Sequence, residues 1–105
     1  MSVRTALVCV LVASAGSTAA AAKATAHTVE IDGVKYSPAT LVVKSGDTVT
    51  WVNKDPFPHT VTDRGAFDSR DIPAGGKWKY VARKRGTYDY GCTYHPNMKG
   101  TLKVE

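Results

Sequence analysis

The stretch GTYDYGCTYHPNM, residues 86–98, begins with the alternation of a β-strand and ends in a short loop. Tyr88, Tyr90 and Cys92 fall on one face of the alternating part, which has the two-residue period of a half-buried strand. Pro96 interrupts this pattern, because proline cannot donate a hydrogen bond to a neighbouring strand. The sequence therefore predicts a strand that carries Cys92, on its buried face, to the start of a tight loop.

The same alternation recurs along most of the chain, between turn residues. Residues 47–53, for example, place Val49 and Trp51 on one face and Thr48 and Thr50 on the other. Glycine and proline recur too often to allow a helix of three turns. The spacing favours an all-β fold, a two-sheet Greek-key β-sandwich. Strands are predicted at residues 29–32, 41–44, 47–53, 59–62, 78–82, 87–92 and 101–104, with a long irregular segment at 63–76.

The N-terminus has the composition of a secretory leader. A basic start is followed by an apolar run at residues 5–15 and then by small residues. That order is typical of a signal peptide, and the apolar run is too short to span a membrane. We therefore expect residues 1–26 to be a signal peptide and residues 27–105 to form a periplasmic domain without a membrane span. Three small-x-small sites leave the cleavage position open, after Ala22, Ala24 or Ala26.

Charge and cysteine content narrow the class of protein. The chain of 105 residues carries a net charge of +5 and two cysteines, of which Cys9 lies in the predicted leader. The remaining Cys92 cannot form an internal disulfide, and an idle thiol is a liability in an oxidising compartment. Cys92 is therefore either buried and inert or a metal ligand. The basic run at residues 83–85 either steers acidic partners or forms a solvated turn, and nucleic-acid binding is not expected of an exported domain.

Four residues form a candidate metal-ligand set. Cys92, His95 and Met98 follow one another at intervals of three residues. A thioether is not a usual zinc ligand, whereas copper accepts thiolate, imidazole and thioether. Two histidines, one cysteine and a weak axial methionine make the trigonal blue-copper electron-transfer site. Because His27 lies in an N-terminus that is expected to be disordered or newly exposed by cleavage, His59 is the candidate for the second histidine.

The chain resembles the cupredoxins, most closely their amicyanin and plastocyanin-like members. The resemblance rests on VEIDGVKYSPATLVVKSGDTVTWVN, PHTV and GTYDYGCTYHPNMKGTLKVE, which together cover most of the predicted domain. It implies a cupredoxin-like fold and one type 1 copper bound by His59, Cys92, His95 and Met98. It also implies that Asn53 ties the loop of the first histidine to the cysteine loop by hydrogen bonds.

The function implied by the resemblance is electron transport. The protein would be a monomer that carries single electrons between redox proteins, with a dehydrogenase as donor and a cytochrome c as acceptor. Phe57, Pro58, Tyr94 and Pro96 would form an apolar docking patch around His95. Four protein ligands leave no open position for a substrate, so the chain is not expected to be an enzyme.

One residue of the loop departs from the resemblance. Amicyanin-like loops often carry proline just before the second histidine, where this chain has Tyr94. Tyr94 keeps its N–H, which we expect to donate to the Cys92 sulfur. Such a bond stabilises electron density on sulfur and would raise the reduction potential.

Three other functions remain open at this stage. The first is a periplasmic copper chaperone or storage protein, which would use the same ligands and exchange Cu(I). The predicted domain offers only one methionine for such a role, Met98. The second is a copper protein or enzyme that chelates the metal through an N-terminal His27. The third is a metal-free binding domain, which leaves the spacing around Cys92 unexplained.

Overall fold

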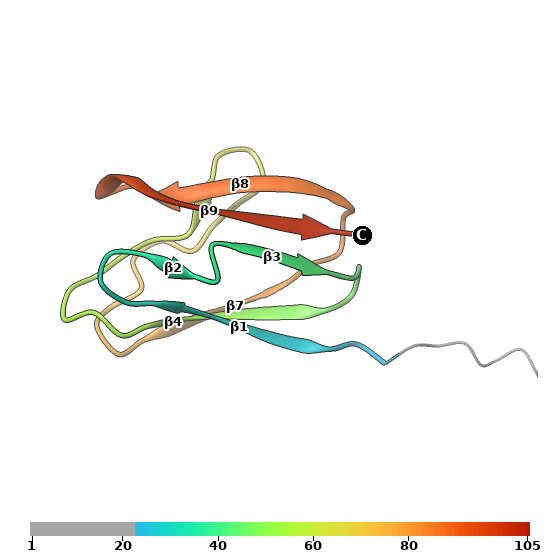
Figure 1. Ribbon diagram of the computed structural model, residues 1–105, viewed down its shortest axis with the longest axis horizontal. Helices are drawn as coiled ribbons and strands as arrows, with labels where there is room; N and C mark the ends of the chain where they lie inside the picture. Colours follow the sequence, from blue (N-terminus) through green and yellow to red (C-terminus); the bar gives the residue numbers. More distant parts are fainter. Residues whose placement is uncertain (1–22) are drawn as a thin grey trace, which may run out of the picture.

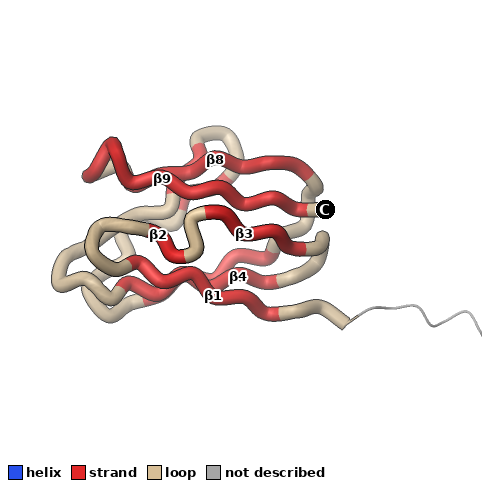
Figure 2. Tube along the Cα trace, in the orientation of Figure 1, coloured by secondary structure: helices blue, strands red, loops and turns tan. Residues whose placement is uncertain are grey.

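The computed structural model describes residues 23–105, so most of the predicted signal peptide lies outside the described residues. Within this part the regular elements are all β-strands (Figures 1 and 2). It contains no helix with the length and apolarity needed to cross a membrane. The strands are β1 (Ala26–Ile31), β2 (Tyr36–Ser37), β3 (Thr40–Val43), β4 (Thr48–Asn53), β5 (Thr62–Asp63), β6 (Phe67–Asp68), β7 (Lys77–Val81), β8 (Gly86–Cys92) and β9 (His95–Val104).

The strands form two sheets that pack against each other. One sheet has the order β2-β1-β4-β7, and the other has the order β3-β9-β8-β5-β6. Two pairs are parallel, β1 with β4 and β3 with β9. The neighbouring β8 and β9 are antiparallel and form a hairpin. The predicted all-β Greek-key β-sandwich is confirmed.

The inward faces are those that the alternation predicts. On β4 the burial alternates along the whole strand, with Val49 and Trp51 fully buried. On the opposite sheet β8 buries Tyr90 and Cys92, and β9 buries Leu102. Each large apolar side chain removed from water contributes about 1.5–3 kcal/mol of transfer free energy. The core therefore holds the strands that lead to the predicted ligands in a fixed register.

Trp51 and Tyr90 connect the two sheets. The Trp51 indole N–H donates to the Tyr90 hydroxyl at 3.2 Å, and the rings meet edge to face with centroids 5.5 Å apart. Burial outweighs this hydrogen bond and raises the pKa of Tyr90 to about 12. Tyr36 packs edge-on against Tyr90 and donates to the Thr60 carbonyl at 2.6 Å. This cluster therefore reaches the segment that follows His59.

The predicted strand at residues 59–62 is only partly present. His59 instead makes an isolated β-bridge with Ile72, and the strand β5 begins at Thr62. The N–H and the carbonyl of His59 are both used in this bridge, at 3.2 and 2.8 Å. The segment is therefore tied to the region expected to be irregular, which also contains β6.

The expectation that His27 lies in a disordered N-terminus is not met. β1 begins at Ala26, and His27 pairs with Val49 of β4. The ring Nε2 lies 2.9 Å from Asp47 Oδ2, and the Thr25 N–H donates to the other carboxylate oxygen at 2.9 Å. The carboxylate and the β4 ladder together hold this part of the chain in the sheet.

The predicted ligands lie at one end of the sandwich. β8 ends at Cys92 and β9 begins at His95, and the segment that carries His59 leaves the end of β4. Figure 1 shows the β8–β9 hairpin and the loop after β4 at the end of the molecule away from the C-terminus. The fold thus brings together residues that are far apart in the sequence.

Candidate metal centre

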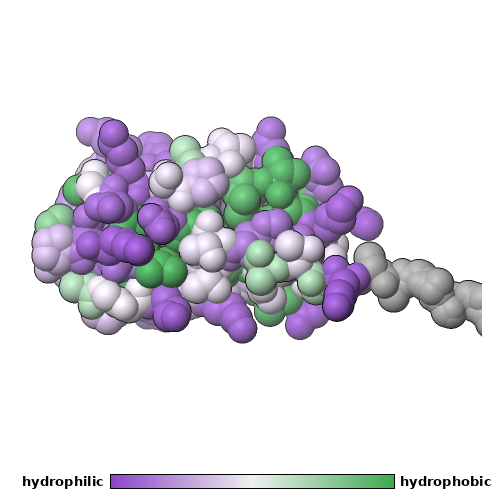
Figure 3. All heavy atoms as spheres, turned by 60° about the horizontal axis from the view of Figure 1, so that its bottom comes forward, coloured by the Kyte–Doolittle hydropathy of each residue, from purple (hydrophilic) through white to green (hydrophobic). Residues whose placement is uncertain are grey.

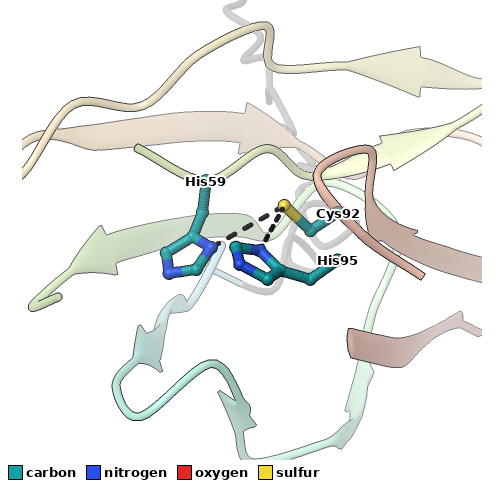
Figure 4. A group of neighbouring side chains, drawn as sticks. All are labelled: His59, Cys92 and His95. Atoms are coloured by element: carbon teal, nitrogen blue, oxygen red, sulfur yellow. Dashed lines mark hydrogen bonds between the residues drawn. The ribbon is translucent and has the colours of Figure 1, made fainter. Parts of the chain in front are cut away.

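Three of the four predicted ligands converge on one point. The Sγ of Cys92 and one imidazole nitrogen each of His59 and His95 lie within 4.8 Å of one another. The sulfur is 3.7 Å from His59 Nδ1 and 3.8 Å from His95 Nδ1 (Figure 4). Metal–sulfur and metal–nitrogen bonds are about 2.0–2.3 Å long. These separations therefore suit three ligands arranged around one small ion.

The hairpin between β8 and β9 positions two of these side chains. Cys92 and His95 are paired across a two-residue turn, with a register shift between Gly91 and Cys92. Such an irregularity bends the strand and redirects the side chain that follows. Cys92 and His59 are buried, whereas His95 is half-buried. The ring of His95 is thus the part of the group that approaches solvent.

Met98 lies on the same strand as His95. It is only 3% exposed, and it borders a surface hollow together with His95. The alternation of β9 turns Met98 toward the core, as it does Leu102. Met98 thus lies buried near the ligand group, and its role as the fourth ligand remains a prediction.

The hydrogen bond to the thiol comes from an unexpected residue. Within residues 23–105 the backbone N–H that reaches the Cys92 sulfur is that of Thr60, at 3.4 Å, rather than that of Tyr94. The Thr60 hydroxyl also accepts the Thr93 N–H at 3.0 Å. Thr60 lies beside the cysteine loop because it follows the bridged His59. It therefore joins the two ligand segments through its backbone and its side chain.

Asn53 has a different role from the one that the resemblance implies. Its buried side-chain amide donates to the carbonyls of Phe57 and Ile72, at 2.9 Å each, and its oxygen accepts the Asp55 N–H at 3.0 Å. These bonds shape the loop before His59 and fasten it to the segment before β7. The link to the cysteine loop is made by the residue after His59 instead.

Asp55 is a residue of the site that the sequence analysis missed. Its Oδ2 lies 2.7 Å from His59 Nε2, and its two oxygens accept the Gly33 and Val34 N–H groups at 2.7 and 2.9 Å. Burial, the largest influence, raises the pKa of Asp55, but the hydrogen bonds outweigh it and leave the pKa below its usual value. The available signal was a carboxylate four residues before a candidate ligand, among prolines and a phenylalanine.

The surface beside the ligand group is apolar. Phe57, Pro58, Tyr94 and His95 line one shallow hollow. Phe57 is 39% exposed and Tyr94 is 52% exposed. The Tyr94 hydroxyl donates to Asp71 at 2.6 Å, so its ring is held at the edge of the hollow. These residues surround the half-buried ligand with apolar surface.

The donor set fits copper. A thiolate and two imidazoles, with a buried thioether nearby, are the soft and intermediate ligands that copper prefers. The carboxylate closest to the group, Asp55, is engaged with His59 Nε2. His59 Nδ1 and His95 Nδ1 face the sulfur and are available for a metal. These residues would hold a copper ion.

Comparison with known proteins identifies the family. The model of the cupredoxin-like domain matches residues 4–104. The chain belongs to the cupredoxin-like family. This cupredoxin is 37% identical to amicyanin of Paracoccus denitrificans over 83 residues, which are 73% of this chain and 63% of that protein. It therefore spans less than two thirds of that relative's length.

A second sequence and a solved structure are also similar to this chain. Plastocyanin of Scenedesmus fuscus is 31% identical over 88 residues, which are 67% of this cupredoxin and 86% of that protein. A solved structure of a Cu(I) amicyanin variant superimposes with a TM-score of 0.73 at 35% identity. That match covers 76% of this chain and 82% of the other. The resemblance to cupredoxins inferred from the sequence is confirmed.

Proposed function

We propose that this cupredoxin binds one type 1 copper ion through His59, Cys92, His95 and Met98 and carries single electrons between redox proteins. The observation that carries the proposal is the convergence of one thiol and two imidazoles within 4.8 Å. Bound copper would supply the one-electron couple between Cu(II) and Cu(I). The similarity to amicyanin and plastocyanin supports this assignment.

The arrangement favours a carrier over an enzyme. A catalytic metal site keeps an open position for water or substrate. Four protein ligands around the copper would leave no such position. His59 and Cys92 are buried, so a substrate could approach only from the side of His95. A closed site of this kind changes its charge by one electron with little movement of its ligands.

Electrons would enter and leave through His95. Its half-buried ring is bordered by Phe57 and Tyr94, both of which expose apolar surface. Weak redox complexes use small interfaces, below about 1,200 Å², and this patch suits such a contact. We propose a periplasmic monomer with a dehydrogenase as donor and a cytochrome c as acceptor, as its similarity to amicyanin suggests.

The test is the visible absorption of the purified protein with one equivalent of Cu(II). We expect an intense blue colour, from a short bond between copper and the Cys92 thiolate, that ascorbate bleaches. Cys92→Ser and His59→Gln should lose the colour. His27→Gln, which removes a histidine bonded to Asp47 outside the ligand group, should keep it.

A copper chaperone or storage protein is the alternative that the same experiment addresses. The ligands would be the same, but the protein would bind Cu(I) and pass it readily to a chelator. A colourless sample that binds Cu(I) tightly and exchanges it would favour this alternative. A sample that binds neither oxidation state would contradict both functions.

A further inference from the structure

The structure places a buried carboxylate directly behind one of the proposed ligands. We propose that Asp55 is a positioning residue that fixes the His59 ring and, through its negative charge, favours Cu(II) over Cu(I). The proposal rests on the proposed function, because it concerns the same copper site. It adds a residue outside the ligand set that would control both the ring and the reduction potential.

The turn between β1 and β2 forms a binding site for this carboxylate. The Gly33 N–H donates to one oxygen of Asp55 at 2.7 Å, and the Val34 N–H donates to the other at 2.9 Å. Gly33 and Val34 both have left-handed backbone conformations, with φ of 65° and 60°. Consecutive N–H groups presented by a turn form a concavity that binds anions.

The positive φ of Val34 indicates that hydrogen bonds around this turn fix its backbone conformation. A β-branched residue rarely adopts a positive φ, because its side chain clashes with the backbone. Such strain persists where surrounding interactions fix the conformation. The Asp32 N–H donates to the Lys35 carbonyl at 3.0 Å and closes the turn. The Asp55 carboxylate accepts a hydrogen bond from the Val34 N–H. The turn and the carboxylate therefore stabilise each other.

The carboxylate is shielded from water at the position where it meets His59. Asp55 is 6% exposed and His59 is fully buried. An ionised carboxylate is costly to bury unless hydrogen bonds compensate for its lost hydration. Two backbone N–H groups and the imidazole of His59 supply these bonds. Asp55 is thus equipped to stay charged inside the protein.

The contact between Asp55 and His59 decides which ring nitrogen faces the ligand group. His59 Nε2 is 2.7 Å from Asp55 Oδ2, whereas His59 Nδ1 is 3.7 Å from the Cys92 sulfur. An ionised carboxylate can only accept hydrogen bonds, so Nε2 carries the proton. Nδ1 then keeps its lone pair for a metal, as in other sites where a carboxylate orients a histidine ligand.

The charge of Asp55 has a consequence for the redox couple. Cu(II) together with the Cys92 thiolate has one net positive charge, whereas Cu(I) with the same thiolate has none. A nearby negative charge in a poorly solvated site stabilises the positively charged state more than the neutral one. Asp55 should therefore lower the reduction potential relative to a neutral side chain of the same shape.

Asp55→Asn removes the charge while it nearly preserves the shape. We expect the midpoint potential, measured by spectroelectrochemical titration with mediators, to rise. The affinity for Cu(II), measured by competition with a chelator, should fall about 10–100-fold, and the affinity for Cu(I) should change less. Glu30→Gln is the matched control, because it removes the same charge from an exposed residue whose ion pair within residues 23–105 is with Lys54, at 3.7 Å. Its potential should stay close to that of the unmodified protein.

A measurement on the unmodified protein keeps the proposal testable if Asp55→Asn does not fold. In the Cu(I) form, ¹⁵N NMR should show a slowly exchanging proton on His59 Nε2. A proton on Nδ1, or rapid exchange of the Nε2 proton, would overturn the inference. So would a blue Asp55→Asn protein with an unchanged potential. Failure of the unmodified protein to form a blue Cu(II) complex would instead overturn the proposed function.

Discussion

Asp47 organises the end of the sandwich opposite the ligand group. Its carboxylate accepts the Thr25 N–H at 2.9 Å and the Lys44 N–H at 3.0 Å, and it lies 2.9 Å from His27 Nε2. These bonds fasten the start of β1 to the turn that precedes β4. The hydrogen bond from Thr25 is the largest cause that lowers the pKa of Asp47, to about 2.

This lowered pKa predicts how Asp47 contributes to stability as the pH changes. A carboxylate with a depressed pKa stabilises the folded protein when it is ionised in both states, and it loses this contribution as it is protonated. The usual value is 3.8. Asp47→Asn should therefore reduce the free energy of unfolding by the largest amount above pH 4, and by progressively less between pH 4 and about pH 2. Urea unfolding of the metal-free proteins across this range measures the difference. A deficit that does not change with pH would contradict the prediction.

Thr60, the residue after the proposed ligand His59, makes hydrogen bonds to the segment that carries Cys92. Its N–H reaches the Cys92 sulfur at 3.4 Å, and its hydroxyl accepts the Thr93 N–H at 3.0 Å. A hydrogen bond to a ligand sulfur is one of the influences that tune a blue-copper potential. Thr60 thus makes the contact with the sulfur that was expected of Tyr94, whose hydroxyl donates to Asp71.

At the scale of the elements, the β8–β9 hairpin leaves no room for a side chain at Gly91 unless a strand moves. A Cβ placed on Gly91 would lie 2.9 Å from the carbonyl oxygen of Met98. That oxygen belongs to the backbone of β9 and cannot rotate away. The close approach of the two strands at this point sets the distance between Cys92 and the strand that carries His95 and Met98. A side chain at position 91 would therefore force one of the two strands to move.

Gly91→Ala should disturb the metal centre as well as the fold. The added methyl group must push β9 away from β8, and overpacking of this kind costs about 1–3 kcal/mol of stability. We expect a lower midpoint in thermal unfolding, a weaker or shifted blue absorption band and a lower affinity for Cu(II). Thr87→Ala, on the exposed face of the same strand, is the control and should leave the spectrum unchanged. An unaltered spectrum in Gly91→Ala would show that the hairpin adjusts without moving the ligands.

The strands that the sequence could predict are those with a long alternating pattern. β4 and β8 show a clear two-residue period, which the sandwich imposes by burying one face. β2 and β6 have two residues each, too few to display a period. His27 was misplaced because the leader-like composition before it conceals the start of β1. That start depends on Asp47, which is 20 residues further along the chain.

The candidate ligands are easier to propose from the sequence than the residues that contact them. Cys92, His95 and Met98 follow one another at intervals of three residues, and the sequence contains few histidines that could join them. The role of Asp55 depends on the N–H groups of Gly33 and Val34, more than 20 residues earlier in the chain. No local pattern reports such a contact, so only the folded arrangement reveals it.

At the scale of the whole molecule, the basic run and the proposed copper ligands lie at opposite ends of the sandwich. The basic run at residues 83–85 lies in the turn before β8, and β8 runs from there to Cys92 at the other end of the sandwich (Figure 1). On the face shown in Figure 3, hydrophilic side chains surround smaller hydrophobic patches. Exposed charges are screened beyond about 8 Å at physiological ionic strength. The basic run would therefore draw a charged partner toward the end of the sandwich away from His95.

The ligand group also connects parts of the chain that are far apart in the sequence. His59 and Cys92 are 33 residues apart, and Cys92 is the only cysteine among residues 23–105, where it is free. A metal bound to both residues would close a long loop, as a disulfide does in other small domains. Metal binding should thus be linked to the stability of the whole fold.

Because copper binding is expected to stabilise the fold, it can also be tested by thermal unfolding, without the visible absorption. A ligand that binds only the folded state stabilises it by about 2.7 kcal/mol when its free concentration is 100 times the Kd. For a domain of this size, each kcal/mol raises the Tm by about 4–8 °C. Copper should therefore raise the Tm of the unmodified protein and of His27→Gln by ten degrees or more, and most of this rise should disappear in Cys92→Ser. Differential scanning calorimetry with and without copper measures the effect. An equal rise in all three proteins would place the copper elsewhere on the molecule, because Cys92→Ser removes the thiolate that the proposed site requires.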